Sequence, residues 1–412
     1  MDVSRKDREV IRKLADKYAG YAHSKVNFDH ISAWRIFNRL GSSQPMIMMD
    51  QFPWHELNIN DELTLICTDP LLRAFENELR HDIYKWEHLD TDQTLALSFS
   101  VPKAINDSGI GIRITENTLA ADNNNNIISH QYADQLVTEE QLELLHNPII
   151  EHDCTETQSR VDALKAIIGD IMPVVSRGVQ PMYVIWDDLA QLRGVTSILM
   201  DFLDRPEFMH NIARKMTDIE VNRLSQFEAL NLLELQPQTI HCSGALTDEL
   251  PATDFDGEHV RGRDCWAMGM GQLFAACSKD LHDEFEITYA REYYQNIGLV
   301  YYGCCEPLHN RIDIIRKLPN VRKISISPWA DAEIAAENIG QDYIMCFKPN
   351  PAFIAVSDID ESTIRDEIKK TLHACRRSKT PCEIILKDVS TVQYQPQRLF
   401  QWSRIVREEI LR

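Results

Sequence analysis

Eight short apolar segments recur along this chain, and stretches with helical periodicity separate them. Alternating strands and helices imply parallel strands joined by crossover helices, since each connection has to return to the start of the sheet. Eight such strands are the number that closes a (β/α)8 barrel. The sequence therefore predicts an α/β TIM barrel, with strands at residues 45–50, 182–187, 239–243, 265–269, 299–303, 323–327, 343–347 and 383–388.

Two parts of the chain do not follow this alternation. Residues 1–44 have the pattern of two helices, so we predict an N-terminal helical extension that lies against the outside of a barrel formed by 45–412. Residues from about 89 to 157 contain the polar run ADNNNN at 121–126, which is typical of a loop tip. We predict that this stretch is an insertion or a small cap on the N-terminal side of the barrel.

The charge balance excludes some partners. The 412 residues include 43 Lys and Arg against 63 Asp and Glu, a net charge of −20. Such a charge repels polyanions, so we expect neither nucleic acid nor an anionic membrane as a partner. The N-terminus lacks the apolar region of a signal peptide, and no apolar run reaches about 18 residues. The ten cysteines are then expected to be reduced, in a cytoplasmic protein, with a homodimer as the commonest oligomer.

Reactive side chains fall at the C-terminal ends of the predicted strands, where a TIM barrel carries its active site. Cysteine, histidine and acidic groups at four of these ends suit zinc. The residues are Asp50 after the first strand, Asp187 after the second, His241 and Cys242 on the third, Cys304, Cys305 and Glu306 after the fifth, Cys346 and Lys348 at the seventh, and Lys387 and Asp388 at the eighth.

Each of these residues also has an ordinary structural interpretation. A cysteine in an apolar strand is more often a core residue than a ligand, and His241 with Cys242 can be a packed pair. Glu306 and Glu284 lie where helices are predicted to begin, and an acid there is favoured by the helix dipole. Lys348 can be a plain loop lysine. From the residues alone, a metal site and packing remain open alternatives.

Five segments follow one another in a characteristic order: MMDQFPWHEL, RGVTSILMDFLDRPEFMHNIARKM, SKDLHDEFEITYAREYYQNIGLVYYGCCEPLHN, SPWAD and CFKPNPAFIA. This order resembles the uroporphyrinogen decarboxylase superfamily, and within it the zinc-dependent, corrinoid-linked methyltransferases. The resemblance extends over roughly residues 45–412 and is weakest across 89–157. It implies the same barrel fold that the strand pattern predicts.

The resemblance also bears on the metal ligands. In that superfamily the strand before EPLHN ends in a His-x-Cys-Gly-like turn; Cys305 matches its cysteine, whereas Gly303 stands at the histidine. The last strand, where another ligand is expected, ends in residues 387–389, Lys-Asp-Val. The resemblance then implies an acid-plus-thiolate set of Glu284, Cys305 and Cys346.

The turn after the first strand separates two branches of the superfamily. The decarboxylases carry an arginine-rich turn there, which binds the propionates of a tetrapyrrole, but residues 50–55 contain no arginine. Phe52 and Trp54 in this turn suit the walls of a pocket for a neutral aromatic or small methylated donor. We expect Asp50, His241 and Lys348 to complete the substrate site.

The resemblance implies that zinc acts as a Lewis acid on the heteroatom that bears a methyl group, in a demethylation whose methyl passes to cobalamin on a separate corrinoid protein. His55 and Asp187 are the expected catalytic proton donors. The nearest match to the Asp-x-His-x-x-Gly signature of corrinoid carriers, at 280–285, ends in Phe285. Two other functions stay open: a metal-free, decarboxylase-like lyase and a non-catalytic ligand-binding barrel.

Overall fold

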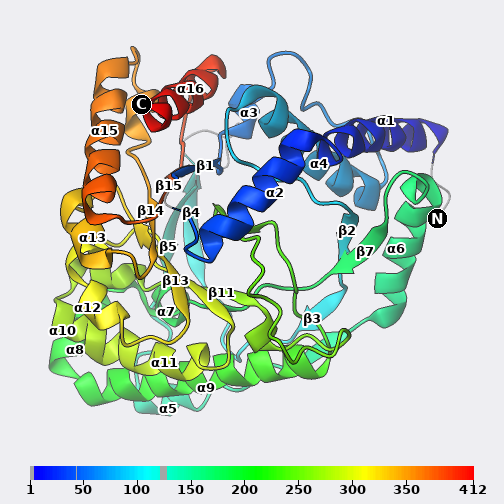
Figure 1. Ribbon diagram of the computed structural model, residues 1–412. Helices are drawn as coiled ribbons and strands as arrows, with labels where there is room; N and C mark the ends of the chain where they lie inside the picture. Colours follow the sequence, from blue (N-terminus) through cyan, green and yellow to red (C-terminus); the bar gives the residue numbers. More distant parts are fainter. Residues whose placement is uncertain (1–3, 43, 121–127) are drawn as a thin grey trace.

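Seven parallel strands form one sheet at the centre of the protein (Figure 1). The computed structural model describes residues 4–42, 44–120 and 128–412. The strand order is β1-β15-β14-β13-β12-β11-β8, and every neighbouring pair is parallel. The strands are β1 (Met46–Met49), β8 (Met182–Tyr183), β11 (Trp266–Gly269), β12 (Leu299–Tyr302), β13 (Val321–Ile326), β14 (Ile344–Phe347) and β15 (Cys382–Leu386).

This sheet confirms the parallel α/β class and contains a strand at seven of the eight predicted positions. The predicted strand 182–187 is shorter than expected, because β8 ends at Tyr183 and Asp187 lies in the first turn of the helix Ile185–Arg193. The expected closure into a barrel is not found in the described residues, because β1 and β8 are the two edges of the sheet and do not pair with each other. A separate parallel pair, β2 (Phe99–Pro102) and β7 (Val174–Arg177), lies on this open side. Beside β1, the backbone N–H of Asp92 donates to the carbonyl of Ile47 at 2.9 Å.

Strand side chains alternate between two apolar clusters, as the pleat of a strand requires. On β1, Met46 and Met48 belong to one cluster, while Ile47 and Met49 belong to the other. We call the first side the inner face; Trp34 also packs there. The second side, the outer face, is covered by helices.

Residues 239–243, predicted as the third strand, do not join the sheet. They form a hairpin of β9 (Thr239–Ile240) and β10 (Ser243–Gly244), whose two turn residues, His241 and Cys242, have φ values of 45° and 66°. Positive φ at both positions defines the turn type that joins two tightly paired strands. Ile240 and Cys242 pack against the inner face, so this segment covers the sheet and does not add a strand to it.

The helices of the outer face are α9 (Pro206–Ala229), α11 (Thr288–Tyr294), α13 (Ala332–Ile339), α15 (Glu361–Ser378) and α16 (Gln397–Leu411). In Figure 1 they surround the left and lower sides of the sheet, and α16 lies above it. The other helices are α3 (Trp54–Leu57), α4 (Pro70–His88), α5 (Glu139–Leu142), α6 (Cys154–Ile168), α7 (Ile185–Arg193), α8 (Val195–Asp204), α10 (Lys279–His282), the π-helix η3 (Asp283–Ile287), α12 (Ile312–Ile315), α14 (Ala352–Ala355), and the short 3-10 turns η1 (Gly262–Asp264), η2 (Gln272–Ala276) and η4 (Leu308–Asn310). Among the described residues, no helix has both the length and the apolar character needed to cross a membrane.

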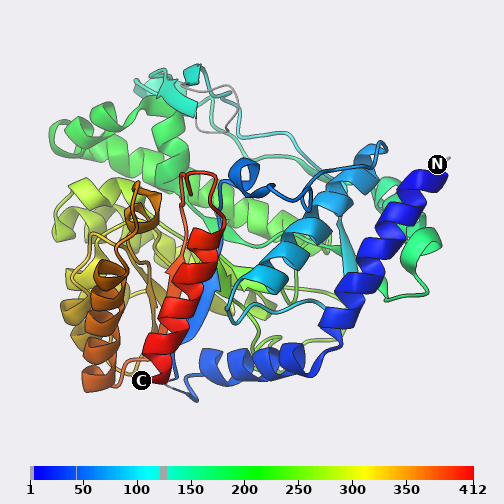
Figure 2. The ribbon, with the colours of Figure 1, turned by 90° about the horizontal axis from the view of Figure 1, so that it is seen from above.

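The N-terminal extension consists of two helices, α1 (Arg5–Ala22) and α2 (Lys25–Asn38). We expected both to lie outside the barrel, but α2 buries Trp34 and Phe37 against the inner face. The inserted segment contains two antiparallel pairs, β3 (Ile105–Asp107) with β6 (Ile150–His152) and β4 (Glu116–Ala120) with β5 (Ile128–Tyr132). Figure 2 shows the second pair (cyan) beside green helices, and α7 is one of its contacts. The polar run 121–126 lies outside the described residues.

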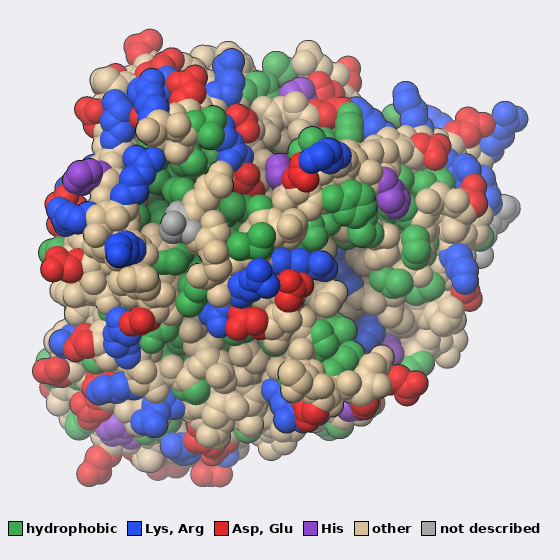
Figure 3. Space-filling model, in the orientation of Figure 1, with side chains coloured by type: hydrophobic (Ala, Val, Ile, Leu, Met, Phe, Trp, Pro, Cys, Tyr) green, Lys and Arg blue, Asp and Glu red, His purple; other side chains and the backbone are tan. Residues whose placement is uncertain are grey.

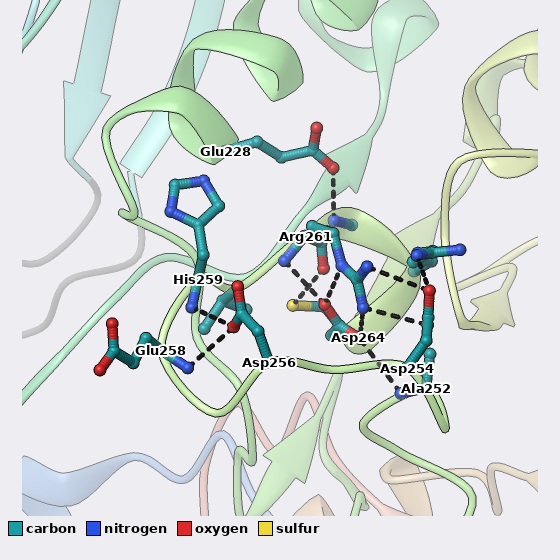
Figure 4. A network of polar contacts seen from close by, with 12 residues as sticks. Glu228, Ala252, Asp254, Asp256, Glu258, His259, Arg261 and Asp264 are labelled. Carbon is teal, nitrogen blue, oxygen red and sulfur yellow. Dashed lines mark hydrogen bonds and ion pairs between the residues drawn. The ribbon is translucent and has the colours of Figure 1, made fainter.

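The connection from the hairpin to β11 is held by a polar network (Figure 4). Asp264, which is completely buried, accepts hydrogen bonds from the Arg261 side chain at 2.8 Å and from the backbone N–H of Ala252 at 3.1 Å. Asp254 binds the same guanidinium at 3.2 Å. The network fixes the loop between the hairpin and β11.

Candidate functional site

Two cysteines lie together where β12 ends. Their sulfur atoms, Sγ of Cys304 and Sγ of Cys305, are 3.6 Å apart. Successive residues of a strand would point to opposite faces, but the chain leaves the strand at Gly303, whose φ is 94°. A Cβ atom there would lie 2.5 Å from Cδ1 of Leu308, so only glycine fits. The turn thus brings both thiols to the same place.

Four hydrogen bonds hold this turn in position. The backbone N–H of Cys304 donates to Oε2 of Glu306 at 2.6 Å, and the N–H of Gly271 donates to the other oxygen at 2.8 Å. The carbonyl of Cys304 accepts from Oγ of Ser325 at 2.7 Å and from Nζ of Lys348 at 3.0 Å. The turn is therefore attached to β13, to the end of β14 and to the loop after β11.

Positive charge surrounds the sulfur pair. Nζ of Lys387 lies 3.6 Å from Sγ of Cys304 and 2.8 Å from a carboxylate oxygen of Asp388. A hydrogen bond from Cys305 and the charge of Lys348 lower the pKa of Cys304, and the same shared proton raises the pKa of Cys305. Burial alone would lower the pKa of Lys387, but the Cys304 thiolate and Asp388 raise it. These surroundings favour the thiolate form at Cys304 and the thiol form at Cys305.

His241, at the tip of the hairpin, completes the surroundings of the thiols. Its ring packs edge-on against Tyr301 with the centroids 5.3 Å apart. Its Nε2 atom is buried and has no hydrogen-bond partner among the described residues. Burial lowers the pKa of His241 and the charges of Lys348 and Lys387 add to this, although the neighbouring Cys304 opposes them. A neutral imidazole with a free nitrogen is available as a ligand or a proton acceptor.

Three carboxyl groups lie near the turn, of which Glu286 and Glu306 are completely buried and Asp187 is partly buried. Asp187 accepts a hydrogen bond from Nε2 of Gln272 at 3.0 Å. Burial and the neighbouring charge of Glu306 raise the pKa of Asp187 to about 7. Glu286 is completely buried, and neither of its carboxyl oxygens has a partner in the described part of the chain. Burial, then Asp187 and Glu306, raise the pKa of Glu286 well above its usual value, which favours the protonated form.

Glu284, a predicted metal ligand, lies two residues before Glu286, which was not predicted to belong to the site. The structure places the side chain of Glu284 half in solvent, where it accepts from Nε2 of His210 at 3.0 Å. The buried face of the same helical stretch contains His282, Phe285, Glu286 and Tyr289. A helical repeat of three and four residues thus runs through Glu286, and this signal could have identified it.

The three predicted metal ligands are not brought together. Cys346 is completely buried in the middle of β14, with its thiol 3.9 Å from the carbonyl of Ile344. Glu284 lies at the surface and Cys305 at the end of β12. Among the described residues, the one group of metal-binding side chains with all ligand atoms within 4.8 Å of one another is Glu62, Glu87 and His88, in which Glu87 already pairs with Lys17 at 2.7 Å.

The aromatic residues after β1 pack against α4. The Trp54 ring stacks on the ring of His81 with the centroids 3.7 Å apart, and Phe52 meets Trp54 edge-on. His55 lies on α3, where its Nε2 is 3.8 Å from Oε1 of Glu56. Phe52, Trp54 and His55 are not among the residues that line the large cavity described next.

A cavity of about 970 Å³ lies on the open side of the sheet. It is bounded by α4, β1, the β2–β7 pair and residues 233–239. Figure 3 shows a hollow on this face, below α2 and right of the centre, with basic side chains inside it. Asp50 lines the cavity. Burial raises the pKa of the Cys242 thiol to about 12, and the negative charge of Asp50 adds to this increase, whereas Lys348 and Lys387 oppose it. Asp50 thus connects the cavity with the end of the sheet that carries the thiols.

Comparison with known proteins gives little support for a function. No protein-family model and no curated protein matches the chain. Solved structures that resemble it include a methyltransferase from Methanosarcina mazei, which is 11% identical, with 93% of this chain and 99% of that chain covered and a TM-score of 0.49. Similarity at this level supports no conclusion about chemistry, and the function has to be argued from the residues of the site.

Proposed function

We propose that the protein transfers a methyl group from a small donor to a corrinoid protein, and that Cys304 and Cys305 form its reaction centre. The main support for this proposal is the pair of sulfur atoms, 3.6 Å apart, at the C-terminal end of a central parallel strand. This end of a parallel α/β sheet is where such proteins bind and convert ligands. The order of sequence segments that resembles the corrinoid-linked methyltransferases supports the choice of reaction.

The donor set at the turn fits a zinc ion better than the predicted set does. Two thiolates on a tetrahedral zinc with bonds of about 2.3 Å have sulfur atoms about 3.8 Å apart, close to the separation observed. His241 offers a third ligand, because its buried Nε2 lacks a partner among the described residues. The three ligand atoms are not among the groups of described residues whose atoms all lie within 4.8 Å of one another, so they would have to come closer together to hold one ion.

A bound zinc ion would supply a Lewis acid that polarises the heteroatom bearing the methyl group. The side chains of this chain supply the rest. Lys348 and Lys387 stabilise negative charge on the sulfur pair. Asp187, with a pKa of about 7, can hold a proton at neutral pH and give it to a departing oxygen or sulfur atom. The catalytic role of His55, which lies 3.8 Å from Glu56, stays a prediction.

The loops after the sheet offer a surface for a partner. Trp329 follows β13, Val356 follows β14 and Tyr394 follows β15, and their exposed fractions are 73%, 46% and 61%. Exposed aromatic side chains are enriched in protein interfaces. A corrinoid protein that docks on these loops would bring its cobalt toward the sulfur pair.

Two measurements on the purified protein test this function. Elemental analysis is expected to find about one zinc per chain, lost in Cys304→Ala and Cys305→Ala but kept in Cys154→Ala, because Cys154 is an exposed thiol away from the site. Methylation of reduced cobalamin, followed by its absorption spectrum, is expected for the wild type and Cys154→Ala only. Release of carbon dioxide by a metal-free protein would instead indicate the lyase, and ligand binding without turnover the non-catalytic barrel.

A further inference from the structure

The thiol pair at the end of β12 differs from the other cysteines in its surroundings. All ten cysteines lie in the described residues, and three of them are not buried: Cys154, Cys277 and Cys305. Of these three, Cys305 is the one whose sulfur contacts the sulfur of another cysteine, at 3.6 Å from that of Cys304. An accessible thiol beside a second thiol is the arrangement in which an oxidised sulfur is captured as a disulfide.

The turn holds the two side chains so that a small movement joins them. A disulfide needs its sulfur atoms about 2.05 Å apart, and rotation about the Cα–Cβ bonds brings two thiols that already touch closer together. The backbone at Cys304 is fixed, since its N–H donates to Glu306 at 2.6 Å and its carbonyl accepts from Ser325 and Lys348. The reacting groups are therefore held side by side before an oxidant arrives.

The two thiols have different surroundings. Nζ of Lys387 lies 3.6 Å from Sγ of Cys304, and its positive charge stabilises the thiolate, which is the nucleophilic form of cysteine. Cys304 is only 5% exposed, so a small oxidant is the kind that reaches it. Cys305 is more exposed and lies beside the sulfur that would be oxidised. Cys304 thus has the position of an attacking thiol and Cys305 that of a resolving thiol.

We propose that Cys304 and Cys305 are a site of reversible oxidation, at which hydrogen peroxide joins the two adjacent residues in a disulfide and so switches the reaction centre off. The cross-link depends on the thiol pair alone. Its effect on zinc and on methyl transfer rests on the proposed function, because the thiolate is the form of cysteine that binds a metal and a disulfide has none.

The oxidation takes place in two steps. The thiolate of Cys304 attacks one oxygen of the peroxide, a sulfur–oxygen bond forms, the oxygen–oxygen bond breaks, and the departing hydroxide takes a proton from solvent to become water. The sulfur of Cys305 then attacks Sγ of Cys304, the sulfur–sulfur bond forms, and the sulfur–oxygen bond breaks. The hydroxide released in this step leaves as water with the proton of the Cys305 thiol. Two thiols are oxidised to one disulfide, and the peroxide is reduced to water.

A disulfide between adjacent residues is expected to be easily reduced. Consecutive Cα atoms lie about 3.8 Å apart, whereas disulfides usually join Cα atoms about 4.4–6.8 Å apart. The shorter distance strains the bond, and strained disulfides have the more oxidising potentials that are typical of regulatory bonds. Dithiothreitol is therefore expected to restore both thiols.

Mass spectrometry after digestion with trypsin tests the cross-link. Residues 292–311 form one tryptic peptide, which contains Cys304 and Cys305 and no other cysteine. After peroxide treatment, and alkylation of free thiols in the unfolded protein, this peptide is expected to carry no alkyl group and to have lost two hydrogen atoms. Dithiothreitol is expected to reverse the change. The buried Cys375 and Cys382 should stay reduced and serve as internal controls.

Three other results for the wild-type peptide would each overturn the proposal. The first is a gain of oxygen in place of the lost hydrogen atoms. The second is a bond between this peptide and another one. The third is full alkylation of both cysteines after treatment with peroxide.

Three variants assign the roles of the two thiols. Cys305→Ala keeps the attacking thiol without its resolving partner, so peroxide is expected to add oxygen to Cys304. Cys304→Ala removes the thiolate, and the remaining Cys305 is expected to react more slowly with peroxide. Cys154→Ala changes an exposed thiol elsewhere and should form the cross-link as the wild type does. Circular dichroism checks folding, and faster oxidation of Cys304→Ala than of Cys305→Ala would contradict the assignment.

The switch and the proposed function can fail separately. Peroxide, once it has been removed, is expected to leave a protein that has released its zinc and no longer methylates reduced cobalamin. A reversible cross-link in a protein that never binds zinc or methylates cobalamin would keep the oxidation site and reject methyl transfer. Methylation that continues in the fully cross-linked protein would keep methyl transfer and reject the switch.

Discussion

Lys323 and Glu383 form an ion pair on the inner face of the sheet, with Nζ of the lysine 3.4 Å from Oε2 of the glutamate and both side chains completely buried. The same Nζ donates to Oγ of Ser243 at 2.5 Å and to the carbonyl of Gly244 at 2.8 Å. One cation thus ties two strands of the sheet to the hairpin that carries His241.

Breaking this pair from one side is expected to be costly. Lys323→Met leaves Glu383 as a buried, unpaired carboxylate and should lower the free energy of unfolding by about 3–5 kcal/mol. The double variant Lys323→Met, Glu383→Leu removes both charges and should lose less than the single variant. Urea unfolding of both proteins measures the difference, and a double variant less stable than the single one would contradict this account.

Gly303 is expected to be irreplaceable at the turn. Gly303→Ala places a Cβ atom 2.5 Å from Leu308 in a backbone with a φ of 94°, and we expect a loss of about 3 kcal/mol in unfolding free energy. The matched control is Gly340→Ala, which has a positive φ of 58° but no atom within 4 Å of the added carbon. It should cost only about 1–2 kcal/mol, from backbone strain. Equal losses in thermal unfolding would show that the contact with Leu308 is unimportant.

Asp187 is expected to make stability depend on pH. Its pKa is raised to about 7 in the folded protein from an ordinary value near 4, so the folded state binds the proton more tightly. The associated stability is complete below about pH 4 and is lost as the pH rises through about 7. Asp187→Asn should therefore gain stability relative to wild type with rising pH, by about 1–3 kcal/mol at pH 8. Denaturant unfolding at pH 5 and pH 8 measures this, and a pH-independent difference would contradict it.

Asp264 is expected to dominate the network before β11. Asp264→Asn keeps the size of the side chain but removes a buried carboxylate that binds Arg261, and we expect a loss of about 2–4 kcal/mol. Asp254→Asn changes an exposed partner of the same arginine and should have little effect. Chemical unfolding of both variants measures their unfolding free energies. A similar loss in the two variants would contradict this prediction.

Much of the sheet could be predicted from the sequence because a buried parallel strand requires a short, continuous apolar run. Seven such runs became strands of the sheet. The run at 239–243 looked the same, but His241 and Cys242 adopt positive φ values there. Glycine or asparagine usually marks such a turn, and neither is present, so no local signal distinguished this hairpin from a strand.

The site was only partly predictable for a similar reason. The position of the thiols at a strand end could be read from the chain, whereas their joint orientation depends on the turn at Gly303. The three predicted metal ligands were chosen along the sequence, and their separation is a matter of tertiary structure. The charged cavity was not anticipated, because it arises where β1 and β8 fail to pair and residues far apart in the chain meet.

The gap between β1 and β8 has a kinetic consequence for an enzyme of the proposed kind. A small molecule can enter through the flank of the sheet, while the loops beyond the strand ends remain free for a macromolecule. Neither substrate then blocks the path of the other, so both can be bound at once and transfer can occur within a ternary complex. Reciprocal plots of initial rate would intersect for such an arrangement, whereas a single shared entrance would favour parallel lines.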